Sequence, residues 1–101
     1  MATAPDPSRI AVVTGAAGGI GRATTLRLLA GGWSVAGVDR VRIADIPPEF
    51  RDGFLSIECD LTDPDVPAEI IARTVRHFGS VGLLVNNAGI SGARPVAETD
   101  D

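Results

Sequence analysis

The stretch Thr14-Gly15-Ala16-Ala17-Gly18-Gly19-Ile20-Gly21 decides how this chain folds. It follows an apolar run over residues 10–13, which is typical of a strand buried on both faces of a parallel sheet. A helix is predicted over residues 18–30, because the glycine pair at 31–32 is a natural helix end. Such a glycine-rich turn can place backbone N–H groups against a pyrophosphate at the positive end of the helix. A plain tight turn is the alternative, and the position between strand and helix favours the nucleotide.

Further strands and a second helix follow in alternation. Residues 34–38 predict a second strand that ends in Asp39, and residues 54–59 a third strand that Asp60 closes. The segment between them, residues 40–53, is irregular because two consecutive prolines exclude a long helix. A helix is predicted over residues 64–78, with Asp63 as its cap and Pro64 at its first position, and a fourth strand over residues 81–85.

This order of elements predicts an α/β fold, a partial NAD(P)-binding Rossmann-like fold with a parallel sheet of about four strands. We expect the spatial order 3-2-1-4 and, because crossovers are right-handed, the two helices on opposite faces. In the helix over 64–78 the apolar side holds Val66, Ile70, Thr74 and Phe78, together with Ile71. The first helix has a less regular pattern, in which Ile20, Thr24 and Leu28 share a face with Gly21.

Length and composition limit the possible functions. A chain of 101 residues is one domain at most. A complete dinucleotide-binding fold has six strands and needs a longer chain. We therefore expect residues 1–101 to be a truncated domain, with a flexible end over residues 1–8.

The net charge of −4 argues against a nucleic-acid surface. The sequence has no signal peptide and no run long enough for a membrane span, so the expected location is the cytoplasm. Cys59 is the only cysteine, expected to be a small buried hydrophobe, and we expect no metal site.

Polar residues at the strand ends are the next candidates for a site. Asp39 lies 18 residues beyond Gly21, close to the spacing of an acid that binds the ribose hydroxyls. Arg40 could meet a 2′-phosphate, but Asp39 would repel one, so NAD is favoured over NADP. Asp60 and the turn over residues 86–89 also lie where ligands of such sheets bind. The alternative for each is an ordinary strand-end or turn residue.

Together, the glycine stretch, Asp39, Asp60-Leu61 and Asn86-Asn87-Ala88-Gly89 resemble the short-chain dehydrogenase/reductase family, in its compact one-domain branch. The resemblance implies that the glycines hold the pyrophosphate and that Ile20 approaches the nicotinamide side. It implies that Asp39 binds the adenosine ribose and that Asp60 and Leu61 contact the adenine. The turn that begins at Asn86 would brace the sheet and border the cofactor. The expected cofactor-binding set is Thr14, Gly15, Gly18, Gly19, Ile20, Gly21, Asp39, Arg40, Asp60, Leu61, Asn87, Ala88 and Gly89.

The chain also departs from the family's pattern. Gly82 replaces a usual aspartate, and the connection from Asp39 to Asp60 is too short for its usual helix. The family's chemistry implies a tyrosine general acid/base assisted by a lysine, and the chain contains neither residue. Ser91 follows the fourth strand and not the fifth, so no catalytic residue is expected.

We therefore expect the cofactor-binding half of an NAD(P)-dependent alcohol/carbonyl oxidoreductase, inactive alone and lacking the catalytic half. A complete parent would take a small alcohol or carbonyl substrate and is expected to form a homo-oligomer. The alternatives are a non-catalytic nucleotide-binding module and a non-functional fragment.

Overall fold

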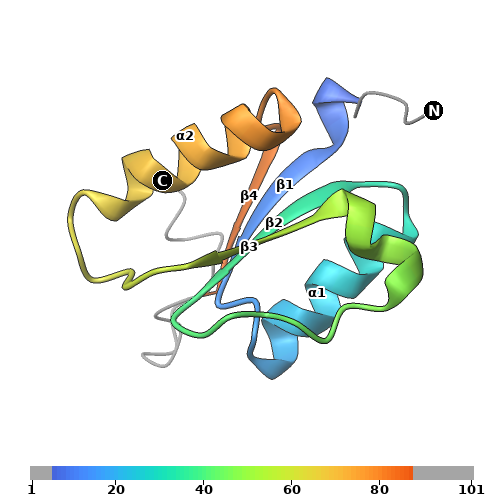
Figure 1. Cartoon of the computed structure of the whole chain (residues 1–101), viewed down its shortest axis with the longest axis horizontal. Coiled ribbons are helices and arrows are strands. Elements are labelled where there is room, and N and C mark those ends of the chain that lie inside the picture. Colours follow the sequence, from blue (N-terminus) through green and yellow to red (C-terminus); the bar gives the residue numbers. More distant parts are fainter. Residues whose placement is uncertain (1–5, 88–101) are drawn as a thin grey trace.

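The sheet forms the centre of the computed structural model, which describes residues 6–87 (Figure 1). Its four strands are β1 (Ile10–Thr14), β2 (Ser34–Asp39), β3 (Phe54–Glu58) and β4 (Leu83–Asn86). All pairings are parallel, and the spatial order is β3-β2-β1-β4. The predicted fold class and strand order are therefore confirmed. β1 lies inside the sheet, and each of its residues is buried, as a continuous apolar strand requires.

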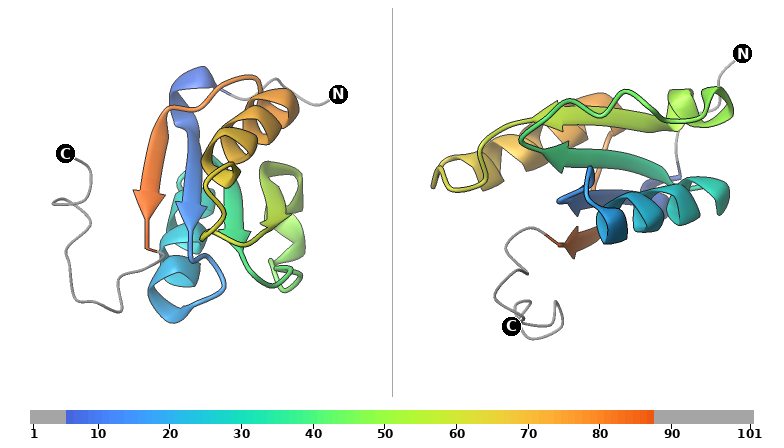
Figure 2. Two further views of the ribbon diagram at one scale, coloured as in Figure 1. Left: turned by 90° about the vertical axis from the view of Figure 1, so that its left-hand side faces the viewer. Right: turned by 90° about the horizontal axis from the view of Figure 1, so that it is seen from below.

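Two helices cover opposite faces of this sheet, as predicted (Figures 1 and 2). They are α1 (Gly19–Ala30) and α2 (Val66–Phe78). Side chains alternate between the two faces along β1, so Val12 joins the core beneath α2 and Val13 joins the core beneath α1.

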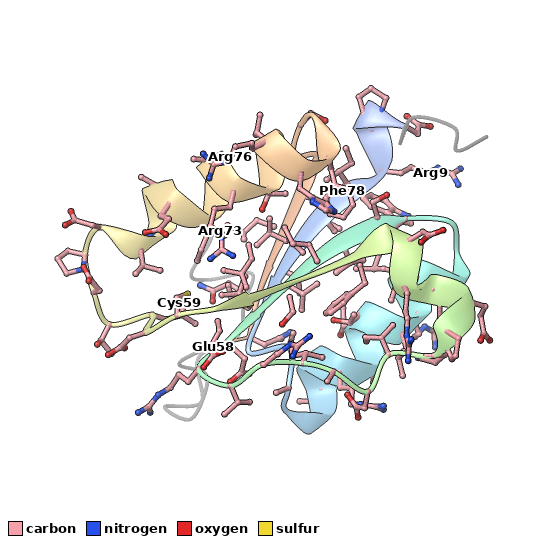
Figure 3. All side chains as sticks on the ribbon, in the orientation of Figure 1. Arg9, Glu58, Cys59, Arg73, Arg76 and Phe78 are labelled. Carbon is pink, nitrogen blue, oxygen red and sulfur yellow. The ribbon has the colours of Figure 1, made fainter. Side chains whose placement is uncertain are left out.

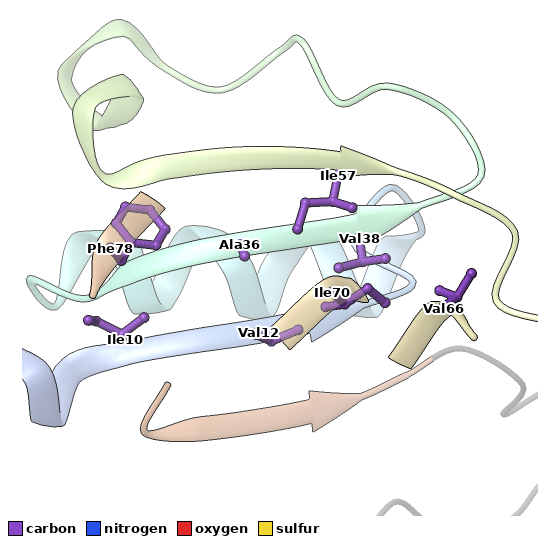
Figure 4. Close-up of a cluster of buried hydrophobic side chains, with 8 residues drawn as sticks. All are labelled: Ile10, Val12, Ala36, Val38, Ile57, Val66, Ile70 and Phe78. Atoms are coloured by element: carbon purple, nitrogen blue, oxygen red, sulfur yellow. The ribbon is translucent and has the colours of Figure 1, made fainter. Parts of the chain in front are cut away.

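The core beneath α2 contains a cluster of eight apolar side chains (Figure 4). Ile10, Val12, Ala36, Val38 and Ile57 of the sheet meet Val66, Ile70 and Phe78 of the helix. Buried positions in α2 recur every four residues, in agreement with the predicted stripe, and Thr74 completes it. Ile71, predicted on this side, is 41% exposed, and it borders an apolar groove with Ile70 and Val12 instead of joining the core.

The start of α2 also differs from the prediction. The helix begins at Val66 after Asp65, two residues later than expected. Asp63 does not cap it: its carboxylate accepts the N–H of Asp65 and closes a preceding turn. The end is as expected, because Gly79 has a φ of 105°, which a glycine adopts without strain.

The side of α1 that packs against the sheet is shifted by one residue from the predicted side. Gly21, Thr25 and Leu29 are buried against the sheet, whereas Ile20 is 71% exposed. Small residues at two of the three contact positions allow the helix axis to approach the strands closely. Because these small residues contribute little apolar surface, the buried side of α1 could not be recognised from hydrophobicity.

The connection between β2 and β3 contains no α-helix, as its length suggested. Residues 40–47 run past α1 as a loop, and a short 3-10 helix, η2 (Pro48–Gly53), leads into β3. Ile43 and Ile46 anchor this connection in the core beneath α1.

The segments that precede β1 and β4 meet at the amino edge of the sheet. A 3-10 turn, η1 (Pro7–Arg9), precedes β1, and Gly82 donates its N–H to the carbonyl of Ile10. β4 starts at Leu83, two residues later than predicted. The predicted flexible end stays a prediction for residues 1–5, which lie outside the described residues. In the described part of the chain, no helix has the length and apolar character needed to cross a bilayer.

Candidate functional site

The carboxyl ends of four parallel strands bring the candidate residues to one edge. β1 leads into the glycine-rich turn, β2 ends at Asp39, β3 leads to Asp60 and β4 ends at Asn86. In sheets of this kind, ligands bind outside this edge where the strand order reverses, here between β1 and β4.

Within the glycine-rich turn, each glycine has a different surrounding. Gly15 has a φ of 65°, in the left-handed region that glycine adopts without strain. A Cβ on Gly21 would collide with the carbonyl of Gly15, so this position holds helix and turn together. A Cβ on Gly19, by contrast, would meet no atom within 4 Å. The open side of the turn therefore lies above Gly19.

The amino end of α1 lacks a side-chain cap. Gly18 is the N-cap, and no side chain accepts a hydrogen bond from the first turn. Amides at such a position carry the positive end of the helix dipole and favour an anion. This end of the helix, next to the open space above Gly19, could hold a phosphate group.

Asp39 links the end of β2 to the same turn. One carboxylate oxygen accepts the N–H of Ala17 at 2.9 Å, and the other accepts the N–H of Arg40 at 2.7 Å. Ala16 also donates its N–H to the carbonyl of Val38 at 3.1 Å. A carboxylate has about four lone-pair positions, so Asp39 can accept further hydrogen bonds from ribose hydroxyls.

Asp60 is held in a turn after β3. One oxygen of its carboxylate accepts both the hydroxyl of Thr62 at 2.7 Å and the N–H of Thr62 at 2.9 Å. These bonds stabilise the ionised form and lower the pKa of Asp60, first through the hydroxyl and then through the N–H, with a smaller effect of Arg40. Leu61 packs against the core beneath α2. Thr62 was not among the candidates, although the Asp-Leu-Thr pattern is typical of such a turn.

The turn after β4 is joined to β1 through a single hydroxyl. Thr14 donates its hydroxyl to the side-chain oxygen of Asn86 at 2.7 Å and accepts the N–H of Asn87 at 3.1 Å. The side-chain amide nitrogen of Asn87 is buried without a hydrogen-bond partner among the described residues. Ala88, Gly89 and Ser91 lie outside the described residues.

An open apolar groove of about 400 Å³ lies beside this edge, on the α2 face of the sheet. Val12, Ile70, Ile71 and Leu84 form its walls, and Leu61, Thr62 and Pro67 line it beside Thr14 and Asn86 at the strand ends.

Cys59 lies next to the site but is not part of it. Its side chain is half-buried against the core, in the connection that follows β3 (Figure 3). Burial raises the pKa of the thiol, so Cys59 stays protonated at neutral pH. His77 is exposed near the end of α2, stacked edge-on against Phe78 and away from the strand ends.

Comparison with known proteins identifies the family. A family model described as short chain dehydrogenase matches residues 9–101. The chain belongs to the short-chain dehydrogenase family. Among the relatives of this chain, a putative ketoacyl reductase of granaticin polyketide synthase from Streptomyces violaceoruber is 38% identical over 98% of the chain and 38% of that protein.

Solved dehydrogenase structures agree with the fold. The menthone neomenthol reductase of Mentha piperita matches with a TM-score of 0.73 and 34% identity over 86% of this chain and 33% of its own. The 3-ketoacyl-(acyl-carrier-protein) reductase of Brucella melitensis, complexed with NADH, matches with a TM-score of 0.69 and 27% identity over 75% of this chain and 32% of its own. The chain thus spans between about a third and two fifths of the length of these relatives.

Proposed function

We propose that this chain binds NAD at the carboxyl edge of its sheet and supplies the cofactor-binding part of an alcohol/carbonyl oxidoreductase. The observation that carries the proposal is the uncapped amino end of α1 beside the carboxylate of Asp39. An anion-binding helix end next to an acceptor for hydroxyl groups matches a pyrophosphate joined to a ribose.

The pyrophosphate is assigned to the turn and the first residues of α1. Gly15, Gly18, Gly19 and Gly21 would form the cradle for its oxygens: Gly19 faces open space, and Gly21 leaves room for the carbonyl of Gly15. Thr14 precedes this turn and bonds Asn86 of the neighbouring strand. Ile20 is exposed beside this space, as expected for a residue that borders the nicotinamide half.

The adenosine is assigned to the ends of β2 and β3. Asp39 would accept the ribose hydroxyls, and Asp60 and Leu61 would border the adenine. Arg40 follows Asp39, and its charge makes a small contribution to the lowered pKa of Asp60. A 2′-phosphate would meet the carboxylate of Asp39, which supports NAD over NADP.

The nicotinamide half has fewer candidate contacts. Asn87 presents a buried amide nitrogen without a described partner, and it lies beside Thr14 at the end of β4. With Ala88 and Gly89 it is proposed to border the cofactor. Bound NAD would supply the hydride chemistry, and the residues of this chain would bind and orient it.

No turnover is proposed for the chain alone. The resemblance to the family implies that a tyrosine, assisted by a lysine, transfers the proton. The sequence contains no tyrosine and no lysine. The activity of a longer protein, its alcohol or carbonyl substrate and its homo-oligomeric assembly belong to the proposal. An assay of NADH formation from simple secondary alcohols tests this part, and any turnover above the buffer blank contradicts it.

The binding proposal is tested by Gly19→Ala. The added methyl group points into open space, so the fold should tolerate it, and alanine suits a helix better than glycine. A pyrophosphate above Gly19 would lose its contact, and we expect NAD affinity to fall by about tenfold or more, which is ~1.4 kcal/mol. Isothermal titration with NAD measures it.

Gly31→Ala is the matched control at the other end of α1. Its Cβ would make only ordinary contacts, 3.4 Å or more, far from the proposed ligand. The control should leave NAD affinity unchanged. Equal affinities of Gly19→Ala and the wild-type chain would remove the pyrophosphate from this turn.

A further inference from the structure

An ion pair joins the first turn of α1 to the loop after β2. The Nε of Arg22 in the first turn of α1 donates to Oδ2 of Asp45 at 3.1 Å, and its terminal nitrogen lies 2.9 Å from the same oxygen. That terminal nitrogen also donates to the backbone carbonyl of Asp45 at 3.1 Å. Among residues 6–87 this is the one ion pair within 4 Å.

The pair and Asp39 contact neighbouring residues along the same two stretches of chain. Arg22 donates its N–H to Gly18, the cap of α1, and Ala17 of the same turn is bound by Asp39. Asp45 lies six residues after Asp39, in the loop that runs past α1 (Figure 1). Asp39 thus joins the end of β2 to the glycine-rich turn, and the Arg22–Asp45 pair joins the start of α1 to the loop after β2.

This position gives the pair a role other than stability. The Arg22 and Asp45 side chains are 38% and 69% exposed, and exposed ion pairs contribute little to folding. A free guanidinium at the first turn of α1 would instead attract phosphate, which it can bind with two parallel hydrogen bonds. Asp45 neutralises that charge and occupies its donors.

We infer that Asp45 determines cofactor specificity, by holding Arg22 so that it is not available to a 2′-phosphate on the adenosine ribose. The inference rests on the proposed NAD site and deepens it. Asp39 would repel the 2′-phosphate directly, whereas Asp45 occupies the guanidinium of Arg22, a cation that could compensate for this repulsion.

The test is the ratio of affinities for NADP and NAD in Asp45→Asn. Losing the carboxylate frees the charge of Arg22, and the NADP:NAD affinity ratio should rise roughly three- to tenfold at low salt and less at high salt. Asp52→Asn makes the same change in net charge within η2, which ends beside Trp33 and Ser34 at the opposite edge, and should leave the ratio unchanged. Far-ultraviolet circular dichroism checks that each variant is folded.

The double variant Arg22→Gln/Asp45→Asn identifies the cation responsible. It should return the ratio to the wild-type value, because the freed guanidinium is gone. An unchanged ratio in folded Asp45→Asn, or a raised ratio that persists in the double variant, overturns this inference while leaving NAD binding intact. Failure of the wild-type chain to bind either cofactor overturns the proposed function, and with it this inference.

Discussion

At the scale of single residues, Asp39 connects the fold to the proposed ligand. Asp39→Ala removes the acceptor of the Ala17 and Arg40 amides and, in the proposed site, of the ribose hydroxyls. Hydrogen bonds to charged groups contribute about 1.5–3 kcal/mol, so NAD affinity should fall roughly tenfold or more. Discrimination against NADP should fall with it, because the repelling charge is lost.

Titrating both cofactors against the wild type, Asp39→Ala and Glu49→Ala measures these changes. Glu49 is an exposed carboxylate in η2, so its variant controls for net charge. A cofactor preference that Asp39→Ala leaves unchanged would remove Asp39 from the site.

Asp60 makes a prediction about pH. Its folded pKa lies below the ordinary 3.8 because Thr62 donates two hydrogen bonds to the ionised carboxylate. A lowered pKa means a stabilising contribution that is present above pH 3.8 and is lost as the pH falls through the folded value. In Thr62→Ala the pKa of Asp60 should rise toward 3.8, as carbon-detected NMR titration of the carboxyl group would show. Wild-type Asp60 titrating at or above 3.8 would be inconsistent with this turn.

At the scale of secondary-structure elements, α1 contains a buried hydroxyl group that a substitution can remove. Thr25 is 1% exposed, and its hydroxyl has no hydrogen-bond partner among the described residues. Thr25→Val replaces that hydroxyl with a methyl group of similar shape and should stabilise the fold by about 1 kcal/mol, since an unsatisfied buried group costs ~1–3 kcal/mol. Urea unfolding gives the change, with Thr24→Val as control, because the Thr24 hydroxyl bonds the carbonyl of Ile20. Destabilisation by Thr25→Val would show that its hydroxyl has a partner.

The same elements show what the sequence could predict. β1 and β2 were recognisable because a strand buried on both faces must be apolar throughout. The stripe of α2 was recognisable because large apolar residues recur every four positions. The face of α1 was misplaced by one residue, because Gly21 and Thr25 pack by being small and not by being hydrophobic.

The site was predictable only where it follows local sequence. The glycine-rich turn and Asp39 are fixed by the order of strand, turn and helix. The Arg22–Asp45 pair joins residues 23 apart through an irregular loop, and no spacing rule predicts such a contact. The hydroxyl of Thr14, which links Asn86 and Asn87, likewise depends on β1 and β4 becoming neighbours.

At the scale of the whole molecule, one side of the sheet leaves apolar surface exposed. Leu83 and Leu84 of β4 and Ile71 and Val75 of α2 are 37–50% exposed, and within the described region β4 pairs only with β1. An unpaired apolar edge promotes association. We expect the chain to form dimers or larger species, and Leu84→Lys to shift it toward monomer.

Size-exclusion chromatography with light scattering over a range of concentrations measures this association. Val41→Lys is the matched control, since Val41 is an exposed apolar residue in the loop after β2, away from β4. A wild-type chain that stays monomeric, with a cooperative unfolding free energy above about 5 kcal/mol, would contradict the expectation.

The central claim is that NAD occupies the carboxyl edge of the sheet, with its pyrophosphate at the start of α1. Titrating NAD into the isotope-labelled chain and following its backbone amide signals by NMR tests this most directly. The account predicts the largest, saturable shifts at Gly18, Gly19 and Ile20, with further shifts at Arg40 and Leu61, and none in η2 or at the end of α2. Saturable shifts confined to other surfaces, or no shifts at millimolar NAD in a folded sample, would contradict it.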